Sequence, residues 1–209
     1  AIRLAFEGRF EIAVAAVILA IALDAIDGRL ARLLKGTSRF GAELDSLADF
    51  VNFGVAPAIL LYFWALNGLK PFGWTICLML AVSCALRLAR FNVALDDPLK
   101  PAYASGFFTG LPAPAGAGLA MVPLYIGFLQ GDSEGHRYAT LIGPAVVLIA
   151  ALMVSRVPTF SGKTVNRVPR EMVVPVLAVA ALVVVCLVTF PWQTLLSLAL
   201  VYAALIPIS

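Results

Sequence analysis

Four aspartates stand close together in the sequence, in two pairs. Asp24 and Asp27 are three residues apart, and Asp45 and Asp49 are four apart. Residues at these spacings share one face of a helix, so each pair presents two carboxylates in one direction. Oxygen ligands without histidine or cysteine suit a hard cation such as Mg²⁺ or Mn²⁺. Four carboxylates are enough for two such ions, and a two-metal site can clamp a phosphate during a displacement reaction.

The elements that carry these aspartates are predicted to be membrane-spanning helices. The chain has 209 residues, of which 62% are hydrophobic and 13% are charged, whereas soluble domains are about half apolar and about a quarter charged. Because about 20 residues cross the hydrocarbon core, the apolar runs predict seven spans: 10–34, 44–66, 71–92, 107–129, 138–156, 172–190 and 192–207. We therefore expect an all-α, polytopic transmembrane helix bundle that forms one domain over residues 1–209.

The short link over residues 35–43 makes the first two spans antiparallel neighbours and brings the two aspartate pairs together. A charge deep in a bilayer costs about 2.5–3.5 kcal/mol. Four unpaired carboxylates would therefore cost on the order of 10 kcal/mol, comparable to the stability of a whole domain. They must be solvated, paired with nearby arginines, or bound to metal.

Loop charges predict which side of the membrane the aspartates face. Arg3, Arg9, Lys70 and Arg137 fall on one side of the predicted spans, and the other eleven Lys and Arg residues fall on the opposite side, with the aspartates. By the positive-inside rule this side is cytoplasmic. We expect a multi-pass protein of the cell inner membrane with a cytoplasmic active site. The basic residues lie between apolar runs, which argues against nucleic-acid binding. The opening residues 1–8, AIRLAFEG, are interpreted as the tail of an earlier, eighth helix.

Small and basic residues are interleaved with the aspartates. Gly28, Ala31 and Gly41 leave room for a ligand to approach the backbone closely. Arg32 follows on the same helix as the first aspartate pair, and Arg39 lies in the link. Acidic, basic and small residues in one window fit metal-assisted binding of a phosphorylated ligand.

The complete spacing, Asp24-x2-Asp27-Gly28-x2-Ala31-Arg32-x8-Gly41-x3-Asp45-x3-Asp49, resembles the signature of the CDP-alcohol phosphotransferases. Within this superfamily, GAELDSLADFVNFGVAPA (41–58), RLARFNV (87–93) and FTGLPAPAGA (108–117) resemble bacterial CDP-diacylglycerol–serine O-phosphatidyltransferases. The resemblance implies transfer of the phosphatidyl group of CDP-diacylglycerol to L-serine, giving phosphatidylserine and CMP. It also implies a homodimer.

The resemblance further implies roles for individual residues. Two divalent ions, Mg²⁺ or Mn²⁺, are expected at the four aspartates, with Asp49 also acting as the general base. The nucleotide is expected to contact Asp24, Gly28, Ala31, Arg32, Ser38 and Gly41.

Serine carries a carboxylate, so the acceptor pocket needs a cation. Arg87 and Arg90 are three residues apart near the same end of the third span and can share one helix face. They are the candidates for binding the acceptor, with Arg156 as a third. The alternative for the arginines is that they extend to the membrane interface, as long basic side chains commonly do.

Two other functions remain open. The same chemistry could serve another acceptor, such as glycerol 3-phosphate, inositol phosphate or choline. Intramembrane acids also mark ion pathways, so a cation transporter is the alternative of a different class. Against it, transporters tend to place their sites at the bilayer midplane within internal repeats, and neither feature is visible in this sequence.

Overall fold

The structure is a computed structural model that describes residues 1–33, 39–95, 107–131, 135–155, 158–160 and 172–206. Of these, residues 27–33, 39, 94–95, 107–109, 158–160 and 173 are described by their backbone alone.

Helices dominate the described residues. In chain order the α-helices are α1 (Ile2–Phe6), α2 (Phe10–Leu33), α3 (Arg39–Asp49), α4 (Ala56–Trp64), α5 (Pro71–Leu95), α6 (Ala113–Ala120), α7 (Val122–Gln130), α8 (Ala139–Val154), α9 (Val173–Thr189) and α10 (Pro191–Leu205). A π-helical segment, η1 (Phe50–Val55), joins α3 to α4, and short 3₁₀ turns precede α5 (η2, Leu66–Leu69) and α8 (η4, Gly135–Tyr138). Two strands, β1 (Phe107–Thr109) and β2 (Pro158–Phe160), complete the set.

Each of the seven predicted spans corresponds to a helix or to a continuous helical run. Four runs in the described part of the chain are long and apolar enough to cross a membrane: Phe40–Trp64, Pro71–Val93, Ala113–Gln130 and Gly135–Val154. The apolar helices Val174–Thr189 and Pro191–Leu205 are shorter. The expected all-α polytopic bundle is therefore confirmed, and the strands are a small addition to it.

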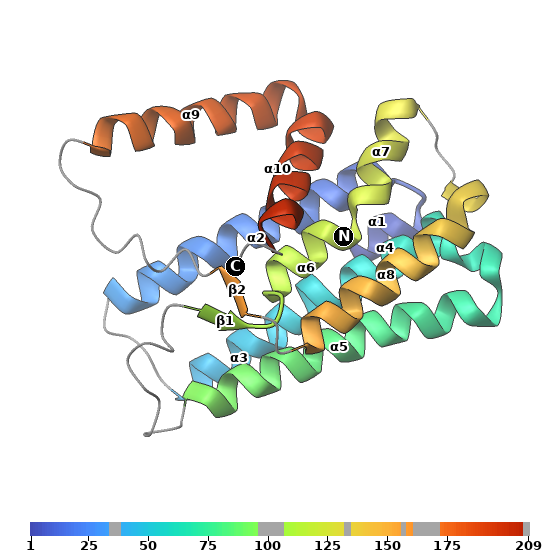
Figure 1. Ribbon diagram of the computed structural model, residues 1–209, viewed down its shortest axis with the longest axis horizontal. Coiled ribbons are helices and arrows are strands. Elements are labelled where there is room, and N and C mark those ends of the chain that lie inside the picture. Colours follow the sequence, from blue (N-terminus) through green and yellow to red (C-terminus); the bar gives the residue numbers. More distant parts are fainter. Residues whose placement is uncertain (34–38, 96–106, 132–134, 156–157, 161–171, 207–209) are drawn as a thin grey trace.

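The bundle is built around η1 and α4, which pack against α2, α5 and α6 (Figure 1). The helices α5 and α8 lie along each other, and α10 packs against α7 and α6. Phe53, Leu60 and Leu61 on the central run are fully buried.

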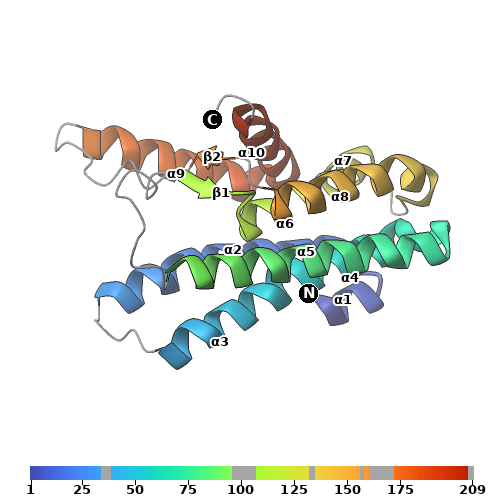
Figure 2. The same ribbon diagram turned by 60° about the horizontal axis from the view of Figure 1, so that its bottom comes forward.

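The helix α9 stands at the edge of the bundle and, among the described elements, packs substantially only against α10 (Figures 1 and 2). Large apolar side chains are exposed all around it, including Leu177, Leu182 and Val188, which is 80% exposed. A helix that is apolar all round must be covered by protein or by lipid. This surface fits the hydrocarbon core of a bilayer, where it would face acyl chains and not water.

The fourth span differs from its prediction at its beginning. A helix was expected from residue 107, but residues 107–109 form β1, and the helix starts only at Ala113. Gly110 has φ +81, and a Cβ at this position would lie 2.7 Å from the carbonyl oxygen of Ser155. Pro112 then caps the helix in an extended conformation. The backbone therefore turns sharply here and enters the bundle as α6.

The pair of strands fastens this turn to the end of α8. β1 and β2 are antiparallel, with Phe107 opposite Phe160 and Thr109 opposite Pro158. The backbone N–H of Leu111 donates to the carbonyl of Leu152 at 3.2 Å. Two chain segments that flank α6 and α8 are thus held together at the end of the bundle that carries α3 (Figure 2).

The π-helical segment η1 begins directly after Asp49 and approaches α5 closely. A Cβ added at Gly54 would lie 3.0 Å from the Cβ of Cys84 and 3.3 Å from its sulfur. Phe53, beside Gly54, is fully buried. A wide helical turn of this kind commonly occurs at functional sites, and here it lies between the acidic helix α3 and the packed helix α4.

We expect Gly54→Val to lower the free energy of unfolding of the detergent-solubilised protein by about 1–3 kcal/mol. The methyl groups of the valine would overpack the contact with Cys84. Gly118→Val is the matched control, because Gly118 is also helical and a Cβ there meets nothing within 4 Å. Thermal unfolding followed by circular dichroism measures both. Equal melting temperatures for the two variants would contradict the packing argument.

Candidate functional site

Three of the predicted aspartates meet at one end of the bundle. Asp24 on α2 and Asp45 and Asp49 on α3 each offer a carboxylate oxygen, and these oxygens all lie within 4.8 Å of one another. Asp24 and Asp49 are half-buried, and Asp45 is exposed. The structure therefore brings together, from two helices, three of the four carboxylates that the sequence singled out.

The sequence of α3 explains why its acids face α2. Phe40, Leu44 and Leu47 recur at the spacing of one helix face and are 78%, 55% and 63% exposed. Asp45 and Asp49 lie on the opposite face, toward Asp24. An amphipathic helix in this position can turn its apolar face to lipid and its acids to the interior of the site.

The three aspartates are partly removed from water and repel one another. The side chains of Asp24 and Asp49 are in hydrogen-bonding contact, and the negative charge of the Asp45 carboxylate also repels that of Asp49. Two carboxylates this close repel each other unless a proton or a cation lies between them. An oxygen-only set of three ligands within 4.8 Å suits a hard divalent cation, so the residues present fit the expected metal.

Among the side chains that the structure describes, Arg87 on α5 is a cation that attracts the charge of Asp49. It is only 8% exposed, and its guanidinium carbon lies 5.9 Å from the ring centroid of Phe91. Its Nε is buried without a hydrogen-bond partner in the described part of the chain. A buried charged group with an unused donor is costly. The Arg87 guanidinium is therefore well placed to donate a hydrogen bond to an anionic ligand beside Asp49.

Arg90 differs from Arg87 although the two are one helical turn apart. Its Nη1 donates to the carbonyl of Val154 at 2.7 Å and to that of Ser155 at 3.3 Å. These are carbonyls at the C-terminal end of α8, where helices have unsatisfied acceptors and favour cations. Arg90 thus ties α5 to α8.

A polar contact between α3 and α5 is the feature that sequence reasoning missed. Asn92 Nδ2 donates to Ser46 Oγ at 3.0 Å and lies 3.5 Å from Glu43 Oε2. Ser46 and Asn92 stand 46 positions apart, so no local pattern links them. The only available signal was that both are polar residues inside stretches that resemble the same family, 41–58 and 87–93.

Several predicted site residues fall outside what the structure describes. Ser38 and Arg156 are not among the described residues. Asp27, Gly28, Ala31 and Arg32 lie on the last turns of α2, described by backbone alone. Gly41 lies on the first turn of α3 and is exposed. The predicted roles of these residues stay predictions.

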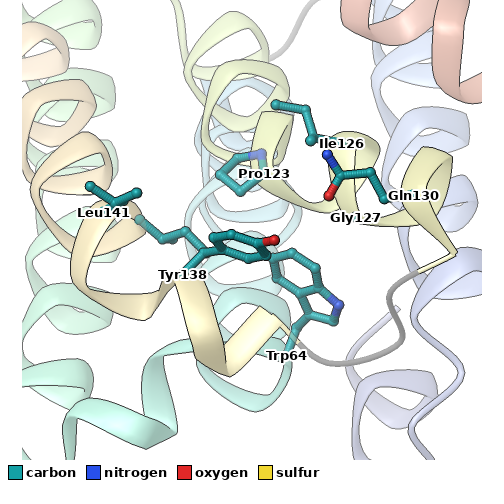
Figure 3. Close-up of a pocket in the computed structure, with 8 residues that line it drawn as sticks. Trp64, Pro123, Ile126, Gly127, Gln130, Tyr138 and Leu141 are labelled. Atoms are coloured by element: carbon teal, nitrogen blue, oxygen red, sulfur yellow. The ribbon is translucent and has the colours of Figure 1, made fainter.

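A cavity of about 240 Å³ lies at the other end of the bundle, between α4, α7 and the start of α8 (Figure 3). Its described lining includes Trp64, Pro123, Ile126, Tyr138 and Leu141, whose sticks surround it in Figure 3, and it holds no carboxylate or basic side chain. An apolar hollow can bind a hydrocarbon chain but cannot grip a diphosphate. The chemistry therefore belongs to the aspartate end.

These observations define a polytopic helical membrane protein with an acidic site at one end of its bundle. Comparison with known families places it more closely. The family described as CDP-alcohol phosphatidyltransferase matches residues 1–155, and the one described as CDP-alcohol phosphatidyltransferase 2 matches residues 171–207. The chain belongs to the CDP-alcohol phosphatidyltransferase family.

Curated relatives are similar over most of the chain. A CDP-diacylglycerol–serine O-phosphatidyltransferase of Mycobacterium leprae is 40% identical over 99% of this chain and 68% of its own length. The protein of the same name from Helicobacter pylori strain J99 is 37% identical over 73% of this chain and 62% of its own length. One from Methanocaldococcus jannaschii is 39% identical over 66% of this chain and 59% of its own length.

The cluster predicts that a divalent ion stabilises the folded protein. At free Mn²⁺ about 100 times its dissociation constant the gain is about 2.7 kcal/mol, which corresponds to roughly 5–10 °C in melting temperature for a chain of this size. Asp49→Asn should largely remove this increase. The control is Glu11→Gln, which removes a carboxylate from the first turn of α2, far from the cluster. An unchanged Mn²⁺ response in Asp49→Asn would contradict the assignment.

Proposed function

We propose that this protein transfers the phosphatidyl group of CDP-diacylglycerol to the hydroxyl of L-serine, releasing phosphatidylserine and CMP. The observation that carries the proposal is the meeting of Asp24, Asp45 and Asp49 beside the buried Arg87. A diphosphate needs positive charge to bind, which carboxylates supply through metal, and serine needs a cation for its own carboxylate. The names of the relatives support serine as the acceptor.

The aspartates are proposed to hold two divalent ions, Mg²⁺ or Mn²⁺. Asp24, Asp45 and Asp49 would hold them together with Asp27, which shares α2 with Asp24. When bound, such ions neutralise the charge that develops on the attacked phosphoryl group and on the leaving CMP. The protein's own contribution is to keep the carboxylates of two helices within reach of one diphosphate.

Asp49 is proposed to accept the proton of the serine hydroxyl. The serine oxygen forms a bond to the phosphorus that carries diacylglycerol, the bond from that phosphorus to the CMP oxygen breaks, and the hydroxyl proton passes to the Asp49 carboxylate. Asp49 is half-buried and interacts electrostatically with Arg87, so the base and the acceptor-binding group would face the same substrate. No covalent enzyme intermediate is required.

Arg87 is proposed to bind the serine carboxylate. A guanidinium can hold a carboxylate through two parallel hydrogen bonds, and the Nε of Arg87 is an available donor within the described structure. Arg90 is already engaged at the end of α8, so we assign it to holding that helix. Arg156 remains a candidate from sequence.

The nucleotide is proposed to lie against the α2 end of the site. Asp24, Gly28, Ala31 and Arg32 follow one another along this helix, and Gly41 opens α3; Ser38 is the sixth candidate. We further propose that the site faces the cytoplasm from the inner membrane, on the basis of the loop charges, and that the protein is a homodimer.

Activity with separate acceptors tests the proposal. The detergent-solubilised protein is given CDP-diacylglycerol and Mg²⁺ or Mn²⁺, and CMP release is measured with serine, glycerol 3-phosphate or inositol phosphate. We expect release with serine, abolished by chelation and reduced at least about 10²-fold by Asp49→Asn, because general-base catalysis contributes about 10²–10⁴-fold.

Each alternative predicts a different result in this assay. Release only with a phosphorylated acceptor would keep the reaction class and overturn serine. Activity that survives Asp49→Asn would remove the general-base assignment. Metal flux in proteoliposomes without CMP release would favour a cation transporter.

Arg87→Lys should raise the KM for serine by about tenfold or more, because an ammonium cannot form the two parallel hydrogen bonds of a guanidinium. The KM for CDP-diacylglycerol should change less than about twofold. Arg90→Lys is the matched comparison, one helical turn away on α5 and bonded to α8. An equal rise in the KM for serine in both variants would contradict the separate assignments.

A further inference from the structure

The acidic helix α3 is held in an unusual way. Of its residues 40–49, only Ser46 and Asp49 are even half-buried, and all the others are exposed. Among described elements its substantial packing is with η1, which is its own continuation. Apolar burial therefore contributes little to fixing where α3 lies relative to α2 and α5.

The contact between Ser46 and Asn92 links α3 to α5, where apolar packing between these helices is slight. Asn92 lies near the end of α5, a long helix packed along α8, and it is half-buried. Its Nδ2 is 3.0 Å from Ser46 Oγ, and its Oδ1 is 3.2 Å from the same oxygen. Ser46 Oγ also lies 3.1 Å from the carbonyl of Ala42.

The single hydroxyl proton of Ser46 can be donated to the Ala42 carbonyl, one turn earlier on α3, or to Asn92 Oδ1. When it goes to the Ala42 carbonyl, Ser46 Oγ accepts from Asn92 Nδ2, so the contact with α5 is kept. The second Nδ2 proton of Asn92 is then free to point to Glu43 Oε2, 3.5 Å away. The amide of one α5 residue thus holds two successive turns of α3.

Ser46 is the direct neighbour of Asp45 and lies one turn before Asp49. A rotation or shift of α3 would therefore move both carboxylates away from Asp24, with which they now lie within 4.8 Å. Groups that orient the ligands of a metal matter nearly as much as the ligands themselves.

We propose that Asn92, acting through Ser46, is a positioning residue that holds α3 so that Asp45 and Asp49 face Asp24. This inference rests on the metal-binding part of the proposed function. It adds a role for two residues to which the proposed function assigns neither substrate nor ion.

The test uses the full chain in detergent with two independent readouts. Mn²⁺ binding is measured by electron paramagnetic resonance of the free ion, and hydrogen–deuterium exchange is followed in peptides over 40–49 and 56–64. The variants are Asn92→Ala, Ser46→Ala and the double variant. The conservative variant is Ser46→Thr, which keeps the hydroxyl, and the control is Val93→Ala, which truncates an exposed neighbour of Asn92.

We expect each alanine variant to weaken Mn²⁺ binding by about tenfold and to speed exchange over 40–49 but not over 56–64. The double variant should be no worse than either single variant, because both remove the same contact. Ser46→Thr should bind Mn²⁺ with an affinity within about twofold of that of the unmodified chain, and Val93→Ala should bind as the unmodified chain does.

Unchanged Mn²⁺ binding and unchanged exchange over 40–49 in Asn92→Ala would overturn the inference. Additive losses in the double variant would also overturn it, because Asn92 would then act by another route. If the unmodified chain binds no Mn²⁺, the metal assignment of the proposed function fails. Exchange over 40–49 then decides: faster exchange in Asn92→Ala supports positioning, and equal exchange overturns it.

Discussion

The constraint on which this structure depends is the repulsion between carboxylates gathered from two helices. Asp24, Asp45 and Asp49 lie within 4.8 Å of one another, in surroundings that are half-buried and close to apolar chain. Such a cluster is unfavourable without a compensating cation. The fold must therefore force the acids together, and a divalent ion bound between them would offset this cost.

Two kinds of contact provide that force. The central run of η1 and α4 is anchored by buried apolar groups such as Phe53 and by the close approach at Gly54, so it fixes the root of α3. Beyond this root, α3 exposes most of its surface and is held by the polar contact of Ser46 with Asn92.

The two arginines on one face of α5 make different contacts. Arg87 is buried beside Asp49, and Arg90 is bonded to the end of α8. Periodicity places both arginines on one face. Which of them is hydrogen-bonded to another helix depends on the elements packed beside it. The end of α8 lies within reach of Arg90 because α8 packs along α5, and the turn at Gly110 lies against the same end of α8.

The sequence alone determined the helical membrane class, the seven helical runs and three acids that meet, Asp24, Asp45 and Asp49, because hydropathy and helical spacing are local properties. It also identified the family, through residues at fixed spacing. It misplaced the start of the fourth span, where Gly110, with φ +81, lies against carbonyls of the distant end of α8 and leaves no room for a side chain. The different roles of Arg87 and Arg90, and the link between Ser46 and Asn92, required the tertiary structure. These features join residues 38 to 65 positions apart in the chain, and no local pattern encodes which side chains meet across such separations.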